Sequence, residues 1–196
     1  RSRDGEWVAQ ADELPRPDES NSTESVVDRF SHYEIGSNAT IFSPQGGLRV
    51  SVPAMARIAQ LLINRGELDD VRLLKTETIE AMEHAQWRYD RAAGNGDTSG
   101  GTFLAFGLGV HLFTGQRLEE AGDMLSPGVG AGWKGHLGEA YGLLSGMLYH
   151  PKNREALVYV INGTPYDISA FPGEYSSFYR WEEQLLTILL QEKENP

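Results

Sequence analysis

The stretch from 130 to 164 constrains the fold more than any other part of the sequence. It contains two long runs of β-forming and aromatic residues, Tyr141–Tyr149 and Ala156–Ile161. Between them, the segment HPKNRE supplies the proline, asparagine and charges that are typical of a turn, so we expect an antiparallel hairpin. The second run is apolar throughout instead of alternating, which predicts a central strand that is buried on both faces.

Two helices are predicted before this hairpin. Ser51 is a suitable N-cap for the first helix, and Pro53 falls in its first turn, where a missing N–H costs nothing. Gly66 is placed to end that helix. We expect a second helix over 77–85, with Thr76 as its cap.

The remaining segments complete an α+β pattern. Residues 86–102 are glycine-rich and predict a loop, and 103–113 reads as one strand that contains two glycines. The segment 173–192 predicts a final amphipathic helix. Its expected apolar stripe consists of Phe178, Trp181, Leu185, Ile188 and Leu189. Helices and antiparallel strands in this order favour an α+β fold over 46–196, preceded by an extended arm over 1–45.

Composition narrows the possible partners. A net charge of −11 argues against nucleic acid and anionic membranes, because both require a basic face. No apolar run approaches the roughly 20 residues of a membrane-spanning helix. The absence of cysteine excludes disulfides, thiolate metal sites and a cysteine nucleophile. The histidines lack the spacing of metal ligands, so we expect neither a metal nor another cofactor.

His136 is the candidate for chemistry, within the segment WKGHLGE. Gly135 and Gly138 flank it at short distance and would let a ligand approach the strand edge closely. An imidazole in such a place can donate or shuttle a proton near neutral pH. The alternative is a histidine that bonds a neighbouring carbonyl at the end of a strand. Considered alone, the pattern favours that alternative, because one histidine between glycines is a weak signal.

An ordered series of segments resembles one family of serine hydrolases. This family includes class C β-lactamases, DD-peptidases and esterases, which share the penicillin-binding fold. Members of this family contain four segments in a fixed order. These are a P-x-GGL-x-S entry to a helix, an NGG…LLSPETI segment, a short strand, and a strand that carries K-T-G, H-T-G or H-G-G. The resemblance covers about residues 5–192, and the matching segments are 43–51 (SPQGGLRVS) with 55–57 (MAR), 64–79 (NRGELDDVRLLKTETI), 106–109 (FGLG) and 135–138 (GHLG).

The resemblance implies roles for five residues. His136 would assist proton transfer or bind the acid or acyl group of the substrate. Gly138 would let the substrate lie against the strand, and the backbone N–H of Glu139 would form half of an oxyanion hole. Trp133 and Tyr141 would be walls of the pocket.

Two elements of the family pattern are missing from the sequence. None of the four lysines has a serine three residues before it, so there is no S-x-x-K, and no tyrosine begins a Y-x-N. We therefore expect the chain to be the C-terminal part of a longer hydrolase and to be inactive alone. A fragment and a processed second chain would look the same. In either case, the strand 156–161 should offer an unpaired edge to a missing N-terminal segment or a second chain.

The resemblance implies acyl-enzyme chemistry on a small-molecule ester, amide, peptide or β-lactam substrate. Histidine in place of the family lysine favours an esterase or a peptidase, because a fixed lysine charge suits a substrate carboxylate better. The residues themselves leave the compartment open, and within that we expect a periplasmic or secreted location. Two alternatives remain: a non-catalytic binding or regulatory module of the same ancestry, and an unrelated α+β domain.

Overall fold

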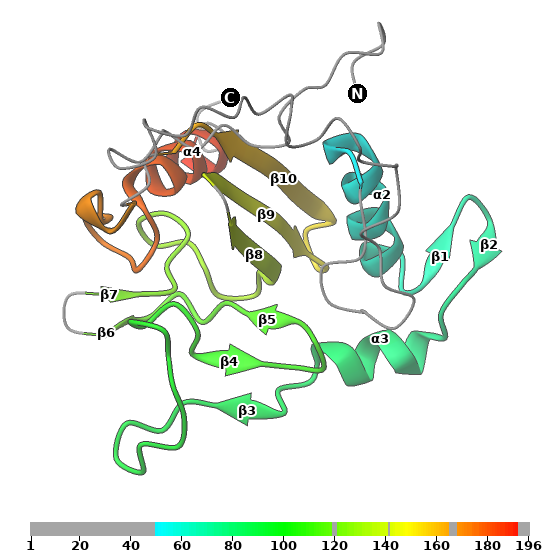
Figure 1. Ribbon diagram of the computed structural model, residues 1–196. Helices are drawn as coiled ribbons and strands as arrows, with labels where there is room; N and C mark the ends of the chain where they lie inside the picture. Colours follow the sequence, from blue (N-terminus) through cyan, green and yellow to red (C-terminus); the bar gives the residue numbers. More distant parts are fainter. Residues whose placement is uncertain (1–49, 119–120, 141, 165–167, 192–196) are drawn as a thin grey trace, which may run out of the picture.

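The computed structural model describes residues 50–118, 121–140, 142–164 and 168–191. Within them it contains three α-helices and a six-stranded antiparallel sheet (Figure 1), which confirms the predicted α+β class. The arm expected over 1–45 and part of the helix entry at 43–51 lie outside the described residues. No helix in the described ranges combines the length and apolar character that crossing a bilayer requires.

The six strands form a continuous antiparallel sheet. In spatial order they are β10 (Glu155–Asn162), β9 (Leu143–His150), β8 (Lys134–Ala140), β5 (His111–Leu112), β4 (Ala105–Phe106) and β3 (Trp87–Arg88). The predicted hairpin is confirmed, since β9 and β10 pair along their whole length, from Leu143↔Asn162 to His150↔Glu155. Two short hairpins lie outside this sheet: β1 (Glu67–Leu68) with β2 (Val71–Arg72), and β6 (Arg117–Leu118) with β7 (Ala121–Gly122).

The prediction of a central strand over 156–161 is wrong. β10 is an edge strand of the sheet, and no described segment pairs with its outer side. Leu157, Tyr159 and Ile161 belong to the hydrophobic cluster on the α4 face. On the other face Ala156 and Val160 are exposed, Val160 by 42%, so the expected burial on both faces is also wrong.

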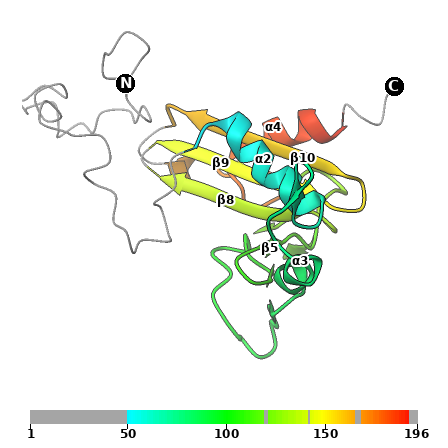
Figure 2. The ribbon, with the colours of Figure 1, turned by 90° about the vertical axis from the view of Figure 1, so that its right-hand side faces the viewer.

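Helices α2 (Val52–Ile63) and α4 (Arg180–Gln191) cover opposite faces of the sheet. Successive residues of β9 point to opposite faces. Tyr149 belongs to a hydrophobic cluster that contains α2 residues, whereas Leu148 belongs to a second cluster that contains α4 residues. Figure 2 shows α2 in front of β8, β9 and β10, with α4 on the far side of β10.

Local signals set the ends of α2 as predicted. Ser51 is the N-cap, and its Oγ accepts a hydrogen bond from the Ala54 N–H at 3.4 Å. Beyond the last turn, Gly66 adopts φ +91°, and its N–H donates to the Leu61 carbonyl. A Cβ on Gly66 would lie 2.2 Å from the Leu74 carbonyl oxygen, so glycine is required there.

Two predicted boundaries shift. Helix α3 spans Thr76–Glu83, and its N-cap is Lys75, so Thr76 is the first helical residue and not the cap. The strand expected over 103–113 is divided into β4 and β5, because Gly109 adopts φ +67° in a tight turn between them. Gly107 in the same turn packs directly on the backbone of α3, where a Cβ would meet the Met82 carbonyl oxygen. This contact fixes the turn against the helix.

The apolar stripe predicted for the last helix is partly wrong, since Phe178 and Leu185 do pack in the core but Ile188 and Leu189 do not. Helix α4 begins at Arg180, later than expected, and its outer face exposes Ile188 and Leu189. The buried side instead contains Leu186 and Leu190, together with two carboxylates described below. Sequence hydrophobicity displaced the buried face because it treated both glutamates as solvent-exposed.

Candidate functional site

The candidate site lies where β8 loses one of its two neighbours. β9 pairs with all of β8, from Lys134 to Ala140. On the other side, β5 pairs only with the first two residues, Lys134 and Gly135. Among the described residues, β9 is the single strand that pairs with 136–140, and we call the second edge of this stretch, with which no described strand pairs, its open edge.

His136 opens this stretch and is exposed. Its Nδ1 lies 2.8 Å from the Leu137 carbonyl oxygen, so the neutral ring that bonds this carbonyl carries its proton on Nδ1. The alternative expected from sequence, a histidine that bonds a neighbouring carbonyl, is therefore true of Nδ1 and does not involve Nε2. Nε2 then keeps its lone pair and can accept a proton from a ligand. The two interpretations of His136 are compatible.

Lys134 lies two residues before His136, but its ammonium group is already paired with a carboxylate. Its Nζ is 2.8 Å from Glu83 Oε2, and Arg65 contacts the same oxygen at 3.0 Å. The Glu83 side chain is only 6% exposed, so this ion pair is largely removed from water. Separating it would leave a buried carboxylate short of partners, which costs several kcal/mol. Lys134 is therefore a structural residue at the start of β8.

Gly138 and Glu139 lie further along the open stretch. A Cβ on Gly138 would come within 2.6 Å of Ser145 Oγ on β9. Because glycine has no side chain, the backbone of β8 is not covered at this point. The Glu139 side chain is exposed and accepts a hydrogen bond from the Tyr179 hydroxyl at 3.0 Å. The predicted roles of both residues concern the backbone of this stretch, and they stay predictions.

Trp133 and Tyr141 were expected to form walls of the pocket. Trp133 is 5% exposed and belongs to the hydrophobic cluster on the α4 face, where its ring contacts His150 at a centroid distance of 5.7 Å. Its indole therefore packs in the core and does not line the open edge of β8. Tyr141 lies outside the described residues.

Sequence reasoning missed a buried histidine behind the site. His111 on β5 is fully buried, and Phe106 stacks on its ring at 5.2 Å with an interplanar angle of 14°. Phe103 and Phe113 contact the same ring at 5.2 and 3.9 Å. Burial, and secondarily the charge of His136, lowers the pKa of His111 to about 3, so its ring is neutral. Its position within the apolar run FLAFGLGVHLF was the available signal.

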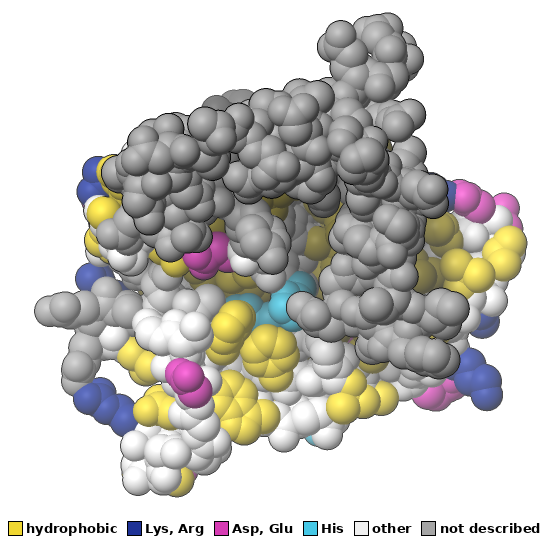
Figure 3. All heavy atoms as spheres, viewed as in Figure 1, with side chains coloured by type: hydrophobic (Ala, Val, Ile, Leu, Met, Phe, Trp, Pro, Cys, Tyr) yellow, Lys and Arg dark blue, Asp and Glu magenta, His cyan; other side chains and the backbone are white. Residues whose placement is uncertain are grey.

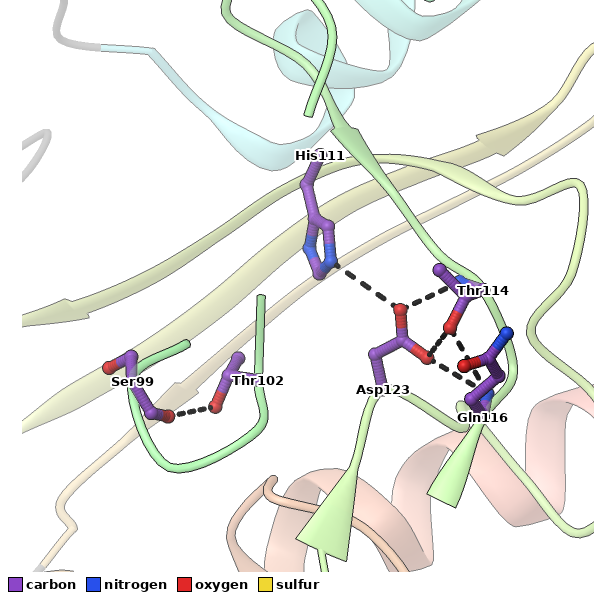
Figure 4. A network of polar contacts seen from close by, with 6 residues as sticks. All are labelled: Ser99, Thr102, His111, Thr114, Gln116 and Asp123. Carbon is purple, nitrogen blue, oxygen red and sulfur yellow. Dashed lines mark hydrogen bonds and ion pairs between the residues drawn. The ribbon is translucent and has the colours of Figure 1, made fainter. Parts of the chain in front are cut away.

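Asp123 is the polar neighbour of His111. Figure 4 shows the two side chains facing each other, with Nε2 3.9 Å from Asp123 Oδ2, which is too long for a hydrogen bond. The carboxylate instead accepts hydrogen bonds from the N–H and hydroxyl of Thr114, at 2.6 and 2.8 Å, and from the Gln116 N–H at 3.1 Å. Burial nevertheless raises the pKa of Asp123. Asp123 thus organises the loop that follows β5.

A second buried carboxyl lies on the α4 face, near Glu139. Glu182 is 5% exposed, and its Oε1 accepts a hydrogen bond from the Tyr159 hydroxyl at 2.8 Å. Burial raises the pKa of Glu182 to about 7, and the charge of Glu139 adds to this shift, although the hydrogen bonds from Tyr159 and Tyr179 oppose it. The open stretch of β8 is therefore adjacent to a carboxyl that titrates near neutral pH.

Comparisons with models of protein families and with curated proteins each found no match. Within the described residues, no group of three or more His, Asp or Glu side chains is placed to hold a metal ion. The chemistry that the site could perform depends on the geometry of β8. That geometry combines an imidazole with one available nitrogen, a glycine and an open strand edge.

Proposed function

We propose that this chain is the C-terminal part of a serine hydrolase of the penicillin-binding fold, acting on an ester or amide through an acyl-enzyme. One observation carries the proposal: His136 and Gly138 lie on the stretch of β8 with whose second edge no strand of the described part pairs. A substrate carbonyl placed along that edge would meet backbone groups of the strand and the imidazole together.

The arrangement around β8 supports the same proposal. The H-x-G strand lies inside an antiparallel sheet that is covered by helices on both faces. Its position in the chain, after the GGL-led helix and before the terminal hairpin, follows the order of segments in the resembling family. The C-terminal portion of that fold is our more specific interpretation of the α+β architecture.

In the proposed reaction, the oxygen of a serine forms a bond to the substrate carbonyl carbon. The bond to the leaving group then breaks, and the leaving group departs with a proton; water later releases the acid and restores the serine. The sequence contains no S-x-x-K, so this serine and its lysine base would come from a segment not included in these 196 residues. His136 Nε2 would hold or transfer the proton of the leaving group.

The charges near the site favour an ester or amide without an anionic group. Lys134, the lysine of this strand, is paired with Glu83 and cannot also bind a substrate carboxylate without breaking that contact. Glu139 adds an exposed carboxylate to the same strand. A β-lactam, whose recognition by this family depends on a carboxylate, fits the site less well than a neutral ester.

The first test is the intact mass of the natural gene product, before and after a fluorophosphonate probe. We expect a species heavier than 21.7 kDa, or a second co-purifying chain, that gains one adduct. In that protein, His136→Gln should lower turnover about 10²- to 10⁴-fold, the usual contribution of a proton-transfer residue. His84→Gln, at an exposed histidine after α3, is the matched control and should leave turnover unchanged.

A natural product of 21.7 kDa that takes no adduct would contradict the proposal and favour a non-catalytic binding module. Labelling together with unchanged turnover in His136→Gln would retain the hydrolase but remove His136 from its chemistry. The two measurements thus test the enzyme and the residue separately.

A further inference from the structure

Aromatic rings adjoin His136 on the sheet surface. Phe106 contacts the His136 ring edge-on at a centroid distance of 6.2 Å, and Phe103 contacts Phe106 at 5.3 Å. Both phenylalanines are half-buried, so part of each ring remains accessible. We call Phe103 and Phe106 the aromatic platform. Figure 3 shows hydrophobic and histidine side chains side by side at the centre of this face, over β4, β5 and β8.

The platform is held in place from below. His111 stacks on Phe106 and meets Phe103 edge-to-face, so both half-buried rings contact a third ring that is fully buried. Since His111 is neutral, this support adds no charge beneath the platform. The Gly107–Val110 hydrogen bond of 2.8 Å closes the adjacent turn. A ligand would therefore meet rings that are already oriented, which lowers the entropic cost of binding.

The charges around the platform disfavour an anionic ligand. In Figure 3 the visible Lys and Arg side chains lie toward the rim of this face, while an acidic side chain is closer to its centre. Lys134, the lysine of β8, is already paired with Glu83 at 2.8 Å. Apolar rings whose neighbouring lysine is occupied in this way suit a ligand that is aromatic and uncharged.

We propose that the aromatic platform binds the uncharged aromatic acyl group of the substrate, so that the preferred substrates are arylacetyl esters or amides. This inference rests on the proposed function. Aromatic pairs are favourable at centroid distances of 4.5–7 Å. The His136 ring centroid is 6.2 Å from that of Phe106, so a short link between a phenyl group on Phe106 and a carbonyl would bring that carbonyl to the edge beside His136.

The test measures binding to the full chain, which needs no nucleophile. The probe is N-methyl-2-phenylacetamide, followed by NMR through the imidazole signals, with the His136 signal assigned from His136→Gln. The comparison ligands are the cyclohexyl analogue and the phenylacetate anion. We expect saturable shifts of the His136 signal and an affinity about three- to tenfold lower for the cyclohexyl analogue. Phenylacetate should bind more weakly than the neutral amide.

Substitutions of single phenylalanines test whether the ligand binds at the aromatic platform. Phe106→Leu should weaken binding of the phenylacetamide about three- to tenfold, with little effect on the cyclohexyl analogue. Phe103→Leu provides the same test if Phe106→Leu fails to fold. Phe171→Leu is the matched control, because Phe171 packs on Trp181 away from this strand, and it should leave the affinity unchanged.

The outcomes separate this inference from the proposed function. Selective binding of the aromatic amide that depends on Phe106 supports the platform, even if the natural protein takes no fluorophosphonate adduct. Equal binding of the cyclohexyl analogue, tighter binding of phenylacetate, or no shift of His136 at millimolar ligand would each overturn it. Those results would leave the hydrolase proposal standing where the probe does label the protein.

Discussion

Glu182 offers a sharp test of how burial sets the stability of this fold. Its carboxyl is 5% exposed, between the Tyr159 hydroxyl and the Tyr179 N–H, and its pKa is raised from 4.5 to about 7. Glutamine has almost the same shape, stays neutral at every pH, and still offers an oxygen to Tyr159; it loses only the long bond of 3.4 Å that Oε2 accepts from the Tyr179 N–H. Glu182→Gln should therefore imitate the protonated glutamic acid and avoid the cost of its buried charge.

The sign and size of the effect follow from proton linkage. The folded carboxyl binds its proton more tightly than the unfolded one, so its contribution to stability is complete below pH 4.5 and is lost as the pH rises through about 7. Each tenfold change in the acid constant is worth about 1.36 kcal/mol, so the full loss is roughly 3 kcal/mol. At pH 8 the variant should exceed the natural chain by up to this amount, and at pH 4.5 the two should be similar.

Urea unfolding followed by tryptophan fluorescence, at intervals between pH 4.5 and 8, would measure both free energies. Only their difference is informative, because Asp123 and His111 titrate in both proteins and cancel. Glu80→Gln, at an exposed position of α3, is the control and should give a flat difference. If the Glu182→Gln and natural curves run parallel within about 0.5 kcal/mol, the carboxyl is not destabilised by burial and our reasoning is wrong.

Two further substitutions test α4. The Glu183 carboxylate accepts hydrogen bonds from three backbone N–H groups of 174–176 and from the Ser176 hydroxyl, at 2.7–3.0 Å. Glu183→Ala should therefore lower the free energy of unfolding, measured in urea, by about 3 kcal/mol or more. A decrease below about 1 kcal/mol would contradict this expectation. Leu186 is fully buried, and Leu186→Ala should cost about 2–5 kcal/mol by thermal unfolding, whereas Ile188→Ala, at a 55% exposed position, should cost under about 1 kcal/mol. The reverse order would restore the apolar stripe expected from sequence.

Local sequence was sufficient where local interactions decide the structure. The cap at Ser51, the left-handed Gly66 and the turn after His150 depend on residues within a few positions, and all three lie where the sequence predicts them. The His136 segment also lies on a strand as expected, although its glycines are unfavourable in strands.

Long-range contacts explain what the sequence did not reveal. Glu182 and Glu183 are buried because a tyrosine of β10 and the backbone before α4 bond them, and neither partner can be inferred from helical periodicity. His111 is buried by rings that converge only when β4 and β5 pair. The order of the strands, which places β10 at the edge, is likewise a property of the assembled sheet.

The contacts at the two ends of β8 also restrict how this strand can shift. At one end Lys134 is attached to Glu83, and at the other Glu139 is attached to the hydroxyl of Tyr179. Between these attachments, His136 and Gly138 pair with β9, and no other described strand pairs with them. The two end contacts and the ladder to β9 together oppose a shift of β8 along its own axis, so the register of His136 and Gly138 relative to β9 is fixed from both ends of the strand.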